Sequence, residues 1–165
     1  MNADLLRNND LALVIFSSDD PHAVARLLTA KNLVFQRVLG TYKGKVEYSF
    51  VVLPEAAEEV ARAGYLDEQE SVLYLEKAHS VGVLFPHWRR HAWLMYMSLA
   101  PEQYMGLWQP VDAVAPNEDY TYAGNVYYVV RDNVQHKKAK TWAAILRGII
   151  FGRIKEKAHK AVQAL

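Results

Sequence analysis

The residues with the widest chemical range gather in one short segment, LVFQRVLGTYKGKVEYSFVVLP, at positions 33–54. A phenol, an amine, a carboxylate and a hydroxyl follow one another there at Tyr42, Lys45, Glu47 and Ser49. Such groups can bind a polar small molecule or exchange protons with it. The alternative is the solvent side of an ordinary hairpin, where a Lys–Glu pair contributes roughly 0.2–1 kcal/mol. The sequence leaves both interpretations open.

A β-hairpin must position these side chains if Lys43 and Gly44 form its two-residue turn. Tyr42 would then face Lys45, and Gly40 would face Glu47. Because side chains alternate along a strand, the polar residues share one face, which we expect to be exposed or partly covered. The opposite face collects the apolar residues that we expect in the core: Phe35, Leu39, Val46, Tyr48, Phe50 and Val52.

The elements around this hairpin follow the order β-α-β-β-α-β. Before it come an apolar strand at 11–16 and a helix with Asp20 as its cap and Pro21 in its first turn. After it come a helix beginning at Pro54 and a strand at 71–76. This order predicts an α+β fold with a ferredoxin-like core over about residues 10–77. A mixed α+β sheet with additional strands is the alternative.

Residues beyond 80 carry weaker patterns. We expect an extension at 80–135 that completes a domain over residues 1–135. In it, 81–85 suggests a further strand, 91–99 fits either helix or strand, and 125–132 is a typical strand. The Pro- and Asn-rich segment 101–122 predicts a long loop. Residues 136–165 predict a long C-terminal helix that packs on the domain or projects from it.

The composition excludes several classes of chemistry. The chain has 165 residues, 52% of them hydrophobic, and no cysteine, so disulfides and thiolate nucleophiles are ruled out. The start of the sequence lacks a signal-peptide pattern, and no apolar run reaches about 18 residues. We therefore expect a cytoplasmic protein. No Walker A loop or dinucleotide fingerprint occurs, so neither a metal nor a cofactor is expected.

The hairpin also resembles a group of small uncharacterised phage and bacterial proteins that share the pattern G-x-Y-x-G-x-x-E-x-S-F-x-V, followed by Q-[ED]-S-V. The first part is matched by Gly40, Tyr42, Gly44, Glu47, Ser49 and Phe50, and the second by Gln69, Glu70 and Ser71. The resemblance covers less than a third of the chain. It implies a shared polar cluster, and a phage origin with a role in handling host machinery. The candidate ligand-binding residues are Tyr42, Lys45, Glu47, Ser49, Gln69 and Ser71.

The charges are unevenly distributed. Residues 136–165 carry a balance of +7, whereas the remaining residues carry −6. An amphipathic basic helix can pack on its own acidic domain, dock in the groove of a protein partner, or lie on an anionic membrane. Nucleic acid is a further alternative, through residues 137–160 together with the motif PHWRRHAW at 86–93. The candidate partner-binding residues are Trp88, Arg89, Arg90, Lys137, Lys138, Lys140, Trp142, Arg147 and Arg153.

Without a catalytic signature, the leading hypothesis from the sequence is a non-catalytic interaction protein that binds and modulates a host macromolecule, most simply a protein. One alternative is a small-molecule or nucleotide-binding protein, or an enzyme, that uses the polar hairpin face. The other alternative is nucleic-acid binding through the basic tail.

Overall fold

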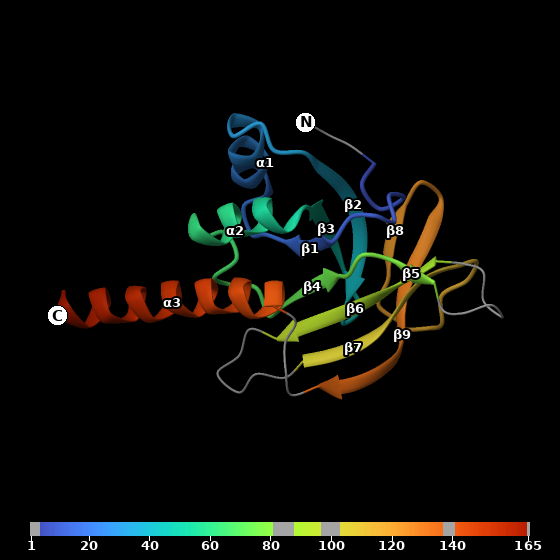
Figure 1. Cartoon of the computed structure of the whole chain (residues 1–165). Helices are drawn as coiled ribbons and strands as arrows, with labels where there is room; N and C mark the ends of the chain where they lie inside the picture. The colour runs from blue at the N-terminus through green and yellow to red at the C-terminus, as the bar shows by residue number, and fades with distance from the viewer. Residues whose placement is uncertain (1–3, 81–87, 97–102, 137–140, 165) are drawn as a thin grey trace.

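The structure is a computed structural model that describes residues 4–80, 88–96, 103–136 and 141–164 (Figure 1). Its helices are α1 (Pro21–Ala30), α2 (Pro54–Arg62) and α3 (Thr141–Gln163). Its strands are β1 (Leu13–Ser17), β2 (Phe35–Tyr42), β3 (Lys45–Val52), β4 (Ser71–Leu75), β5 (His79–Ser80), β6 (Trp88–Tyr96), β7 (Gln103–Val111), β8 (Thr121–Ala123) and β9 (Val126–His136).

The sheet closes on itself. Within the described residues, hydrogen-bonded neighbours run in the order β4-β1-β3-β2-β8-β9-β7-β6, and β6 pairs back with β4. Every one of these pairings is antiparallel, so the eight strands form a closed barrel, and the short β5 adds to β6 outside the ring. The expected ferredoxin-like α+β core is therefore wrong, because the strands that follow residue 80 join β2 to β4 instead of leaving an open sheet.

The strand pairings test the expectations for the second half of the chain. The long loop expected at 101–122 is wrong, since β7 occupies Gln103–Val111 and pairs on both sides, with β6 and β9. The segment 91–99, whose pattern fitted either a helix or a strand, is a strand as far as Tyr96. The expected strand at 125–132 is confirmed within β9. The further strand suggested at 81–85 lies outside the described residues.

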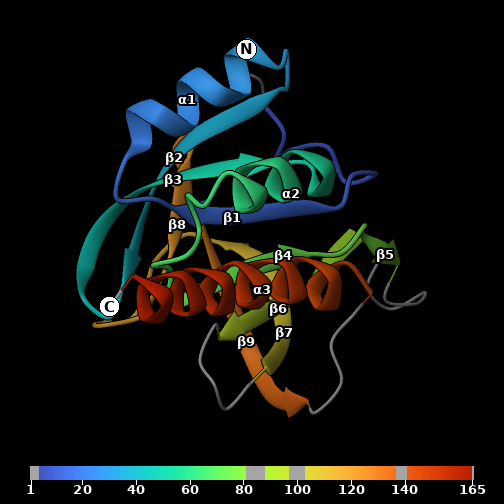
Figure 2. The same ribbon diagram turned by 90° about the vertical axis from the view of Figure 1, so that its left-hand side faces the viewer.

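The helices cover part of the outer surface of the barrel (Figure 2). Helix α1 begins as expected, with Asp20 Oδ1 accepting a hydrogen bond from Ala23 N at 3.1 Å. Between the helices and the sheet lies an apolar core formed by strand residues such as Phe16 and Phe50, whose rings stack 5.6 Å apart, and by helix residues: Val24, Leu28, Ala57, Val60, Leu146 and Ile150. The first half of α3 therefore packs on the barrel, whereas residues 155–164 are exposed.

The hairpin has the expected register, with Tyr42 opposite Lys45 and Gly40 opposite Glu47. Its two faces differ from expectation in what covers them. Val46 and Tyr48, expected in the core, are 57% and 68% exposed because the helices cover only the other end of β3. The polar face of the hairpin, expected to be exposed or partly covered, lines the inside of the barrel.

The inward-facing residues change character along the barrel. Toward one end they are apolar and buried, and they form an inner cluster: Leu13, Ile15, Val38, Val51, Leu75, Ala92 and Trp108. Toward the other end the same strands present Ser17, Tyr42, Glu47 and Ser71. This gradient follows the strand alternation, since each residue lies two positions from its inward neighbour.

The N-terminal segment plugs the apolar end. Leu5 and Leu6 are buried in the inner cluster, and their backbone N–H groups donate to Gln36 Oε1 at 2.9 and 3.0 Å. The Arg90 guanidinium, 2% exposed, donates to the carbonyl oxygens of Leu6, at 3.3 Å, and of Asn8. Burial lowers the pKa of Arg90. The barrel is thus closed at one end and open at the other.

Among the residues that the structure describes, no helix is both long enough and apolar enough to cross a membrane.

The turn of the hairpin depends on backbone conformation. Lys43 and Gly44 have φ angles of +51° and +79°, the pair of positive values that a type I′ turn requires. A Cβ atom at Gly44 would meet no atom within 4 Å, so substitution there costs conformational energy only. We expect Gly44→Ala to lower the free energy of unfolding by about 1 kcal/mol. Gly44→Asn, whose side chain tolerates this conformation, should cost less. Urea unfolding measures both, and equal stability of Gly44→Ala and the wild type would contradict this account.

Candidate functional site

A cavity of about 670 Å³ opens at the polar end of the barrel. Strands β1 to β4 supply one side of its wall, and the strand β9 with the segment 118–121 supplies the other. Its floor is the upper edge of the apolar interior, where Ile15, Leu73 and Trp108 lie. The cavity is therefore the unfilled end of the barrel, and a ligand there would contact polar groups near the mouth and apolar groups beneath.

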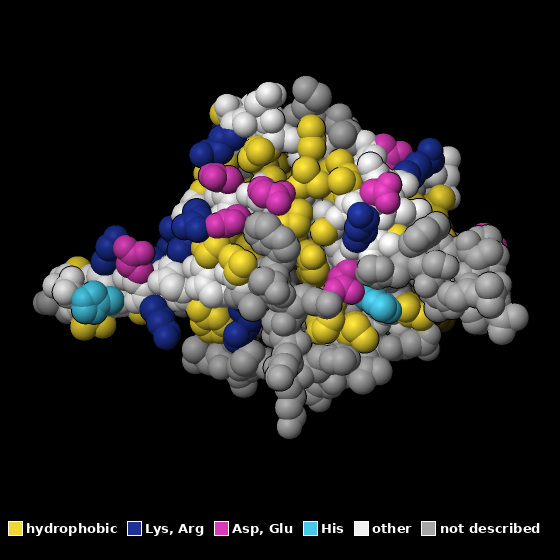
Figure 3. All heavy atoms as spheres, viewed as in Figure 1, with side chains coloured by type: hydrophobic (Ala, Val, Ile, Leu, Met, Phe, Trp, Pro, Cys, Tyr) yellow, Lys and Arg dark blue, Asp and Glu magenta, His cyan; other side chains and the backbone are white. Residues whose placement is uncertain are grey.

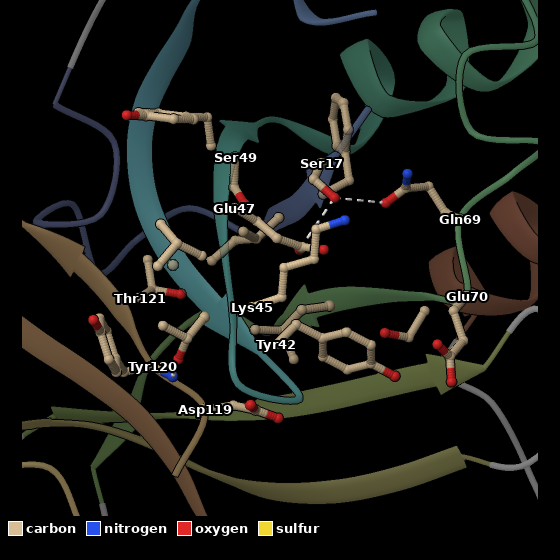
Figure 4. A pocket seen from close by; sticks show the side chains of 18 of the residues that line it. Ser17, Tyr42, Lys45, Glu47, Ser49, Gln69, Glu70, Asp119, Tyr120 and Thr121 are labelled. Atoms are coloured by element: carbon tan, nitrogen blue, oxygen red, sulfur yellow. Dashed lines mark hydrogen bonds between the residues drawn. The ribbon is translucent and has the colours of Figure 1, made fainter. Parts of the chain in front are cut away.

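All six residues proposed from the sequence as ligand-binding line this cavity: Tyr42, Lys45, Glu47, Ser49, Gln69 and Ser71 (Figure 4). The register of the hairpin brings the first four together, and the pairing of β4 with β1 brings Ser71 beside them. The sequence did not identify the other polar lining residues, which come from β1, the connections and β8: Ser17, Asp19, Glu68, Asp119, Tyr120 and Thr121. Pairings between segments far apart in the sequence, β1 with β3 and β2 with β8, place Ser17 and Thr121 at the cavity.

Three side chains in the cavity point toward one another (Figure 4). The Ser17 hydroxyl lies 3.2 Å from Glu47 Oε2 and 3.0 Å from Gln69 Oε1. A hydroxyl has one hydrogen, so it donates to one of these oxygens at a time. The described residues give Glu47 no ion-pair partner within 4.0 Å. Glu47 therefore presents a carboxylate that a cationic ligand could neutralise.

The segment before β8 is tied to the hairpin and completes the mouth. Thr41 N donates to Tyr120 O at 2.9 Å, and Tyr120 N donates to Thr41 Oγ1 at 3.2 Å. Lys43 N donates to Asp119 Oδ1 at 2.8 Å. A Cβ atom at Gly40 would lie 3.1 Å from Tyr120 O. Glycine at position 40 thus allows this close approach, which gives one motif residue of the hairpin a structural reason.

Two acidic groups at the mouth are neutralised by pairs within the chain. Glu70 pairs with Lys43, and this hydrogen bond is the main cause of a lowered pKa for Glu70. The Tyr42 hydroxyl is buried and makes no hydrogen bond with a described residue, yet it lies close enough to contribute a smaller lowering. Glu118 receives two hydrogen bonds of 3.0 Å from Arg131, which lower its pKa.

The remaining charges make the cavity negative. Beyond those two pairs, the lining contains Asp19, Glu47, Glu68 and Asp119 against the single cation Lys45. Aromatic groups lie deeper, where Trp108 stacks on Tyr128 with ring centres 5.3 Å apart and planes 8° apart. Burial raises the pKa of Tyr128, so its hydroxyl stays neutral. The cavity therefore suits a positively charged ligand that also carries a flat apolar group.

Of the candidate partner-binding residues, the structure describes the side chains of Arg90, Arg147 and Arg153. Arg90 is buried in the barrel and bonded to the N-terminal segment, so its guanidinium is not presented to a partner. Arg153 forms an ion pair with Asp67, and Arg147 lies 4.4 Å above the Phe151 ring. Figure 3 shows basic side chains along α3, whose one acidic residue is Glu156.

The other partner candidates are placed only by their backbone or not at all. Trp88 and Arg89 begin β6, where they pair with Ser80 and His79, and Trp142 lies in α3. Lys137, Lys138 and Lys140 lie outside the described residues. Contact of residues 137–160 with a protein, nucleic acid or an anionic membrane stays a prediction.

Comparison with known proteins gives one match. The model of the S-adenosylmethionine lyase family matches residues 18–131. No curated protein and no solved structure matches the chain.

This match overturns the leading functional hypothesis. A lyase family indicates an enzyme, so the expectation of a non-catalytic interaction protein is wrong, and the alternative of a small-molecule site on the hairpin is closer. The comparisons also give no support for a phage origin. The prediction of a non-catalytic protein was wrong because the candidate residues belong to no widespread catalytic motif, and an enzyme need not contain one.

The Glu118–Arg131 pair should make the mouth of the cavity sensitive to pH. Because its pKa is lowered in the folded protein, Glu118 stabilises the fold above its unfolded pKa, and this contribution is lost as pH falls through the folded pKa. We expect Glu118→Gln to reduce the free energy of unfolding by about 1 kcal/mol at pH 7 and by less in acid. Denaturant unfolding from pH 7 to pH 3 measures this difference. Glu156→Gln, at an exposed pair on α3, is the control, and a difference that stays constant with pH would contradict the prediction.

Proposed function

Because this chain belongs to the S-adenosylmethionine lyase family, we propose that its barrel cavity binds S-adenosylmethionine and cleaves a carbon–sulfur bond at the sulfonium centre. The family match over residues 18–131 carries this proposal, since the matched residues include most of the cavity wall. The lack of cysteine in the sequence supports a cytoplasmic location for the reaction.

The substrate has the properties that the cavity requires. At neutral pH S-adenosylmethionine carries a sulfonium and an ammonium against one carboxylate, so its net charge is +1. A negative cavity concentrates such a cation. Its adenine is a flat ring that aromatic side chains can contact, and Trp108, Tyr120 and Tyr128 line this cavity. The volume of about 670 Å³ lies within the range of about 300–1,000 Å³ that is usual for small-molecule sites.

The charge of the substrate determines which groups can promote cleavage. The sulfonium loses its positive charge as the carbon–sulfur bond breaks, and the departing thioether is neutral and needs no proton. A carboxylate held against the sulfur would stabilise the substrate more than the transition state, which would slow the reaction. An apolar surrounding has the opposite effect, because it disfavours the concentrated charge of the substrate.

The polar mouth and the apolar floor of the cavity would bind different parts of the substrate. We assign Glu47, with Ser17 and Gln69 orienting it, to the substrate ammonium, where its attraction persists throughout the reaction. The sulfonium would then lie against the apolar floor near Ile15, Leu73 and Leu94. The electron pair of the broken carbon–sulfur bond goes to the sulfur, and the carbon forms its new bond within its own fragment. A lyase therefore uses neither water nor an external acceptor, and the two products together have the mass of the substrate.

The activity test uses purified protein and S-adenosylmethionine. Mass spectrometry should show a thioether nucleoside and a second product whose masses sum to that of the substrate, without an added water. Glu47→Gln keeps the shape of the side chain and removes its charge, and we expect kcat/KM to fall about 10- to 100-fold. Glu58→Gln is the matched control, because Glu58 pairs with Arg62 on α2 outside the cavity. No substrate loss with the wild type, or equal rates for wild type and Glu47→Gln, would reject the proposal.

Ionic strength provides an independent test of the charge argument. Salt screens the attraction between a net cation and a negative cavity. We expect KM for S-adenosylmethionine to rise severalfold between low salt and 0.5 M NaCl, while kcat changes little. Glu47→Gln should show a shallower rise, since one of the attracting charges is gone. A KM that is flat or falls with salt would show that the cavity charges do not act on the substrate.

A further inference from the structure

The charged side of α3 contacts the connection between α2 and β4, residues 63–70. Asp67 in this connection forms ion pairs with two α3 residues, with Lys157 Nζ at 2.8 Å and Arg153 Nε at 3.5 Å. The Asp67 side chain is 2% exposed, whereas those of Arg153 and Lys157 are 30% and 59% exposed. A carboxylate buried to this extent is unfavourable unless cations compensate it, and α3 supplies them.

The backbone of the connection is shaped to receive Arg153. Arg153 Nη1 donates to Arg62 O at 2.6 Å. Gly64, with a φ of +90°, lies directly beneath the guanidinium, and a Cβ atom there would come within 2.5 Å of Arg153 Nη2. The left-handed conformation therefore favours glycine at this position, and a larger residue would displace the guanidinium from its place. Arg153 therefore makes a backbone hydrogen bond here in addition to its ion pair with Asp67.

The same connection contributes residues to the lining of the cavity. Glu68, Gln69 and Glu70 line it, and Gln69 contacts the Ser17 hydroxyl that also contacts Glu47. Leu66, fully buried, anchors the connection in the core on one side of Asp67. The ion pairs with α3 hold the next residue, which lies only two positions before Gln69. Gln69 is thus two positions from a residue held by α3, and no α3 side chain that the structure describes lines the cavity.

We propose that Asp67 is a positioning residue, and that α3 acts through Arg153 and Lys157 to hold residues 63–70 so that Gln69 stays in contact with the Ser17 hydroxyl, which also contacts Glu47. Helix α3 lies outside the residues matched by the family model, 18–131, so this support is an addition to the matched part of the chain. The structural part of the inference stands by itself, and only its kinetic consequence rests on the proposed function.

The test compares Asp67→Asn and the double variant Arg153→Gln/Lys157→Gln with the wild type. Hydrogen exchange of backbone amides should become faster in residues 63–70 and stay unchanged in β1 and β3. KM for S-adenosylmethionine should rise about five- to tenfold, while kcat changes less than twofold, because substrate binding loses an ordered contact. Lys157→Arg preserves the cation and should behave as wild type.

The control is Lys155→Gln/Lys160→Gln, which removes the same charge from α3, and neither side chain pairs with Asp67. If the first double variant fails to fold, Lys157→Gln alone, at a more exposed side chain, gives the same comparison at smaller amplitude. Unchanged exchange in 63–70 together with unchanged KM would overturn the proposal. An inactive wild type would reject the proposed function instead, and the exchange comparison would still decide whether α3 orders this connection.

Discussion

The pairing of β4 with β6 is the constraint on which the rest of the structure depends. Without it, β1 to β4 would form one edge of an open sheet, with one face under the helices and the other in solvent. With it, the second face becomes an interior. Every polar residue on that face is then either buried or directed into a cavity. This explains why Ser49 and Thr121 are buried polar residues, at 8% and 9% exposure, beside apolar neighbours.

The two ends of the closed barrel differ in how their interior is filled. At one end the N-terminal segment inserts Leu5 and Leu6, and Gln36 and Arg90 satisfy the backbone groups that this insertion buries. At the other end the polar ends of the strands surround a cavity that the described residues leave unfilled. The apolar filling is necessary for stability, because a buried barrel interior without side-chain contacts would lose packing energy. The open end holds the cavity that we propose as the ligand site.

The charge of the open end connects this architecture with the family match. Pairs within the chain neutralise Glu70 and Glu118 at the mouth. Among the described residues, Glu47 contacts the Ser17 hydroxyl and has no ion-pair partner. A sulfonium substrate needs attraction to enter and an apolar place in which to lose its charge. The cavity offers both, at different depths. Helix α3 adds a further layer, since it orders from outside a connection that borders the cavity.

The sequence alone determined the local structure of the first half of the chain. The Lys43-Gly44 turn, the register of β2 with β3, the cap at Asp20 and the shared face of Tyr42, Lys45, Glu47 and Ser49 all follow from patterns within a few positions of one another, whereas Gln69 and Ser71 were added through the resemblance. Strand alternation is a local property, so it sorts residues onto two faces without identifying what covers each face. The resemblance to uncharacterised proteins with the hairpin motif remains untested.

Only the tertiary structure decided that the polar face is an interior, that Val46 and Tyr48 lie outside, and that Ser17 and Asp119 join Glu47. It also decided that Arg90 is buried and that Arg153 meets Asp67. These outcomes depend on strands paired across long sequence separations, such as β2 with β8 and β4 with β6. No local period encodes such pairings, because an open sheet and a closed barrel require the same alternation in each strand.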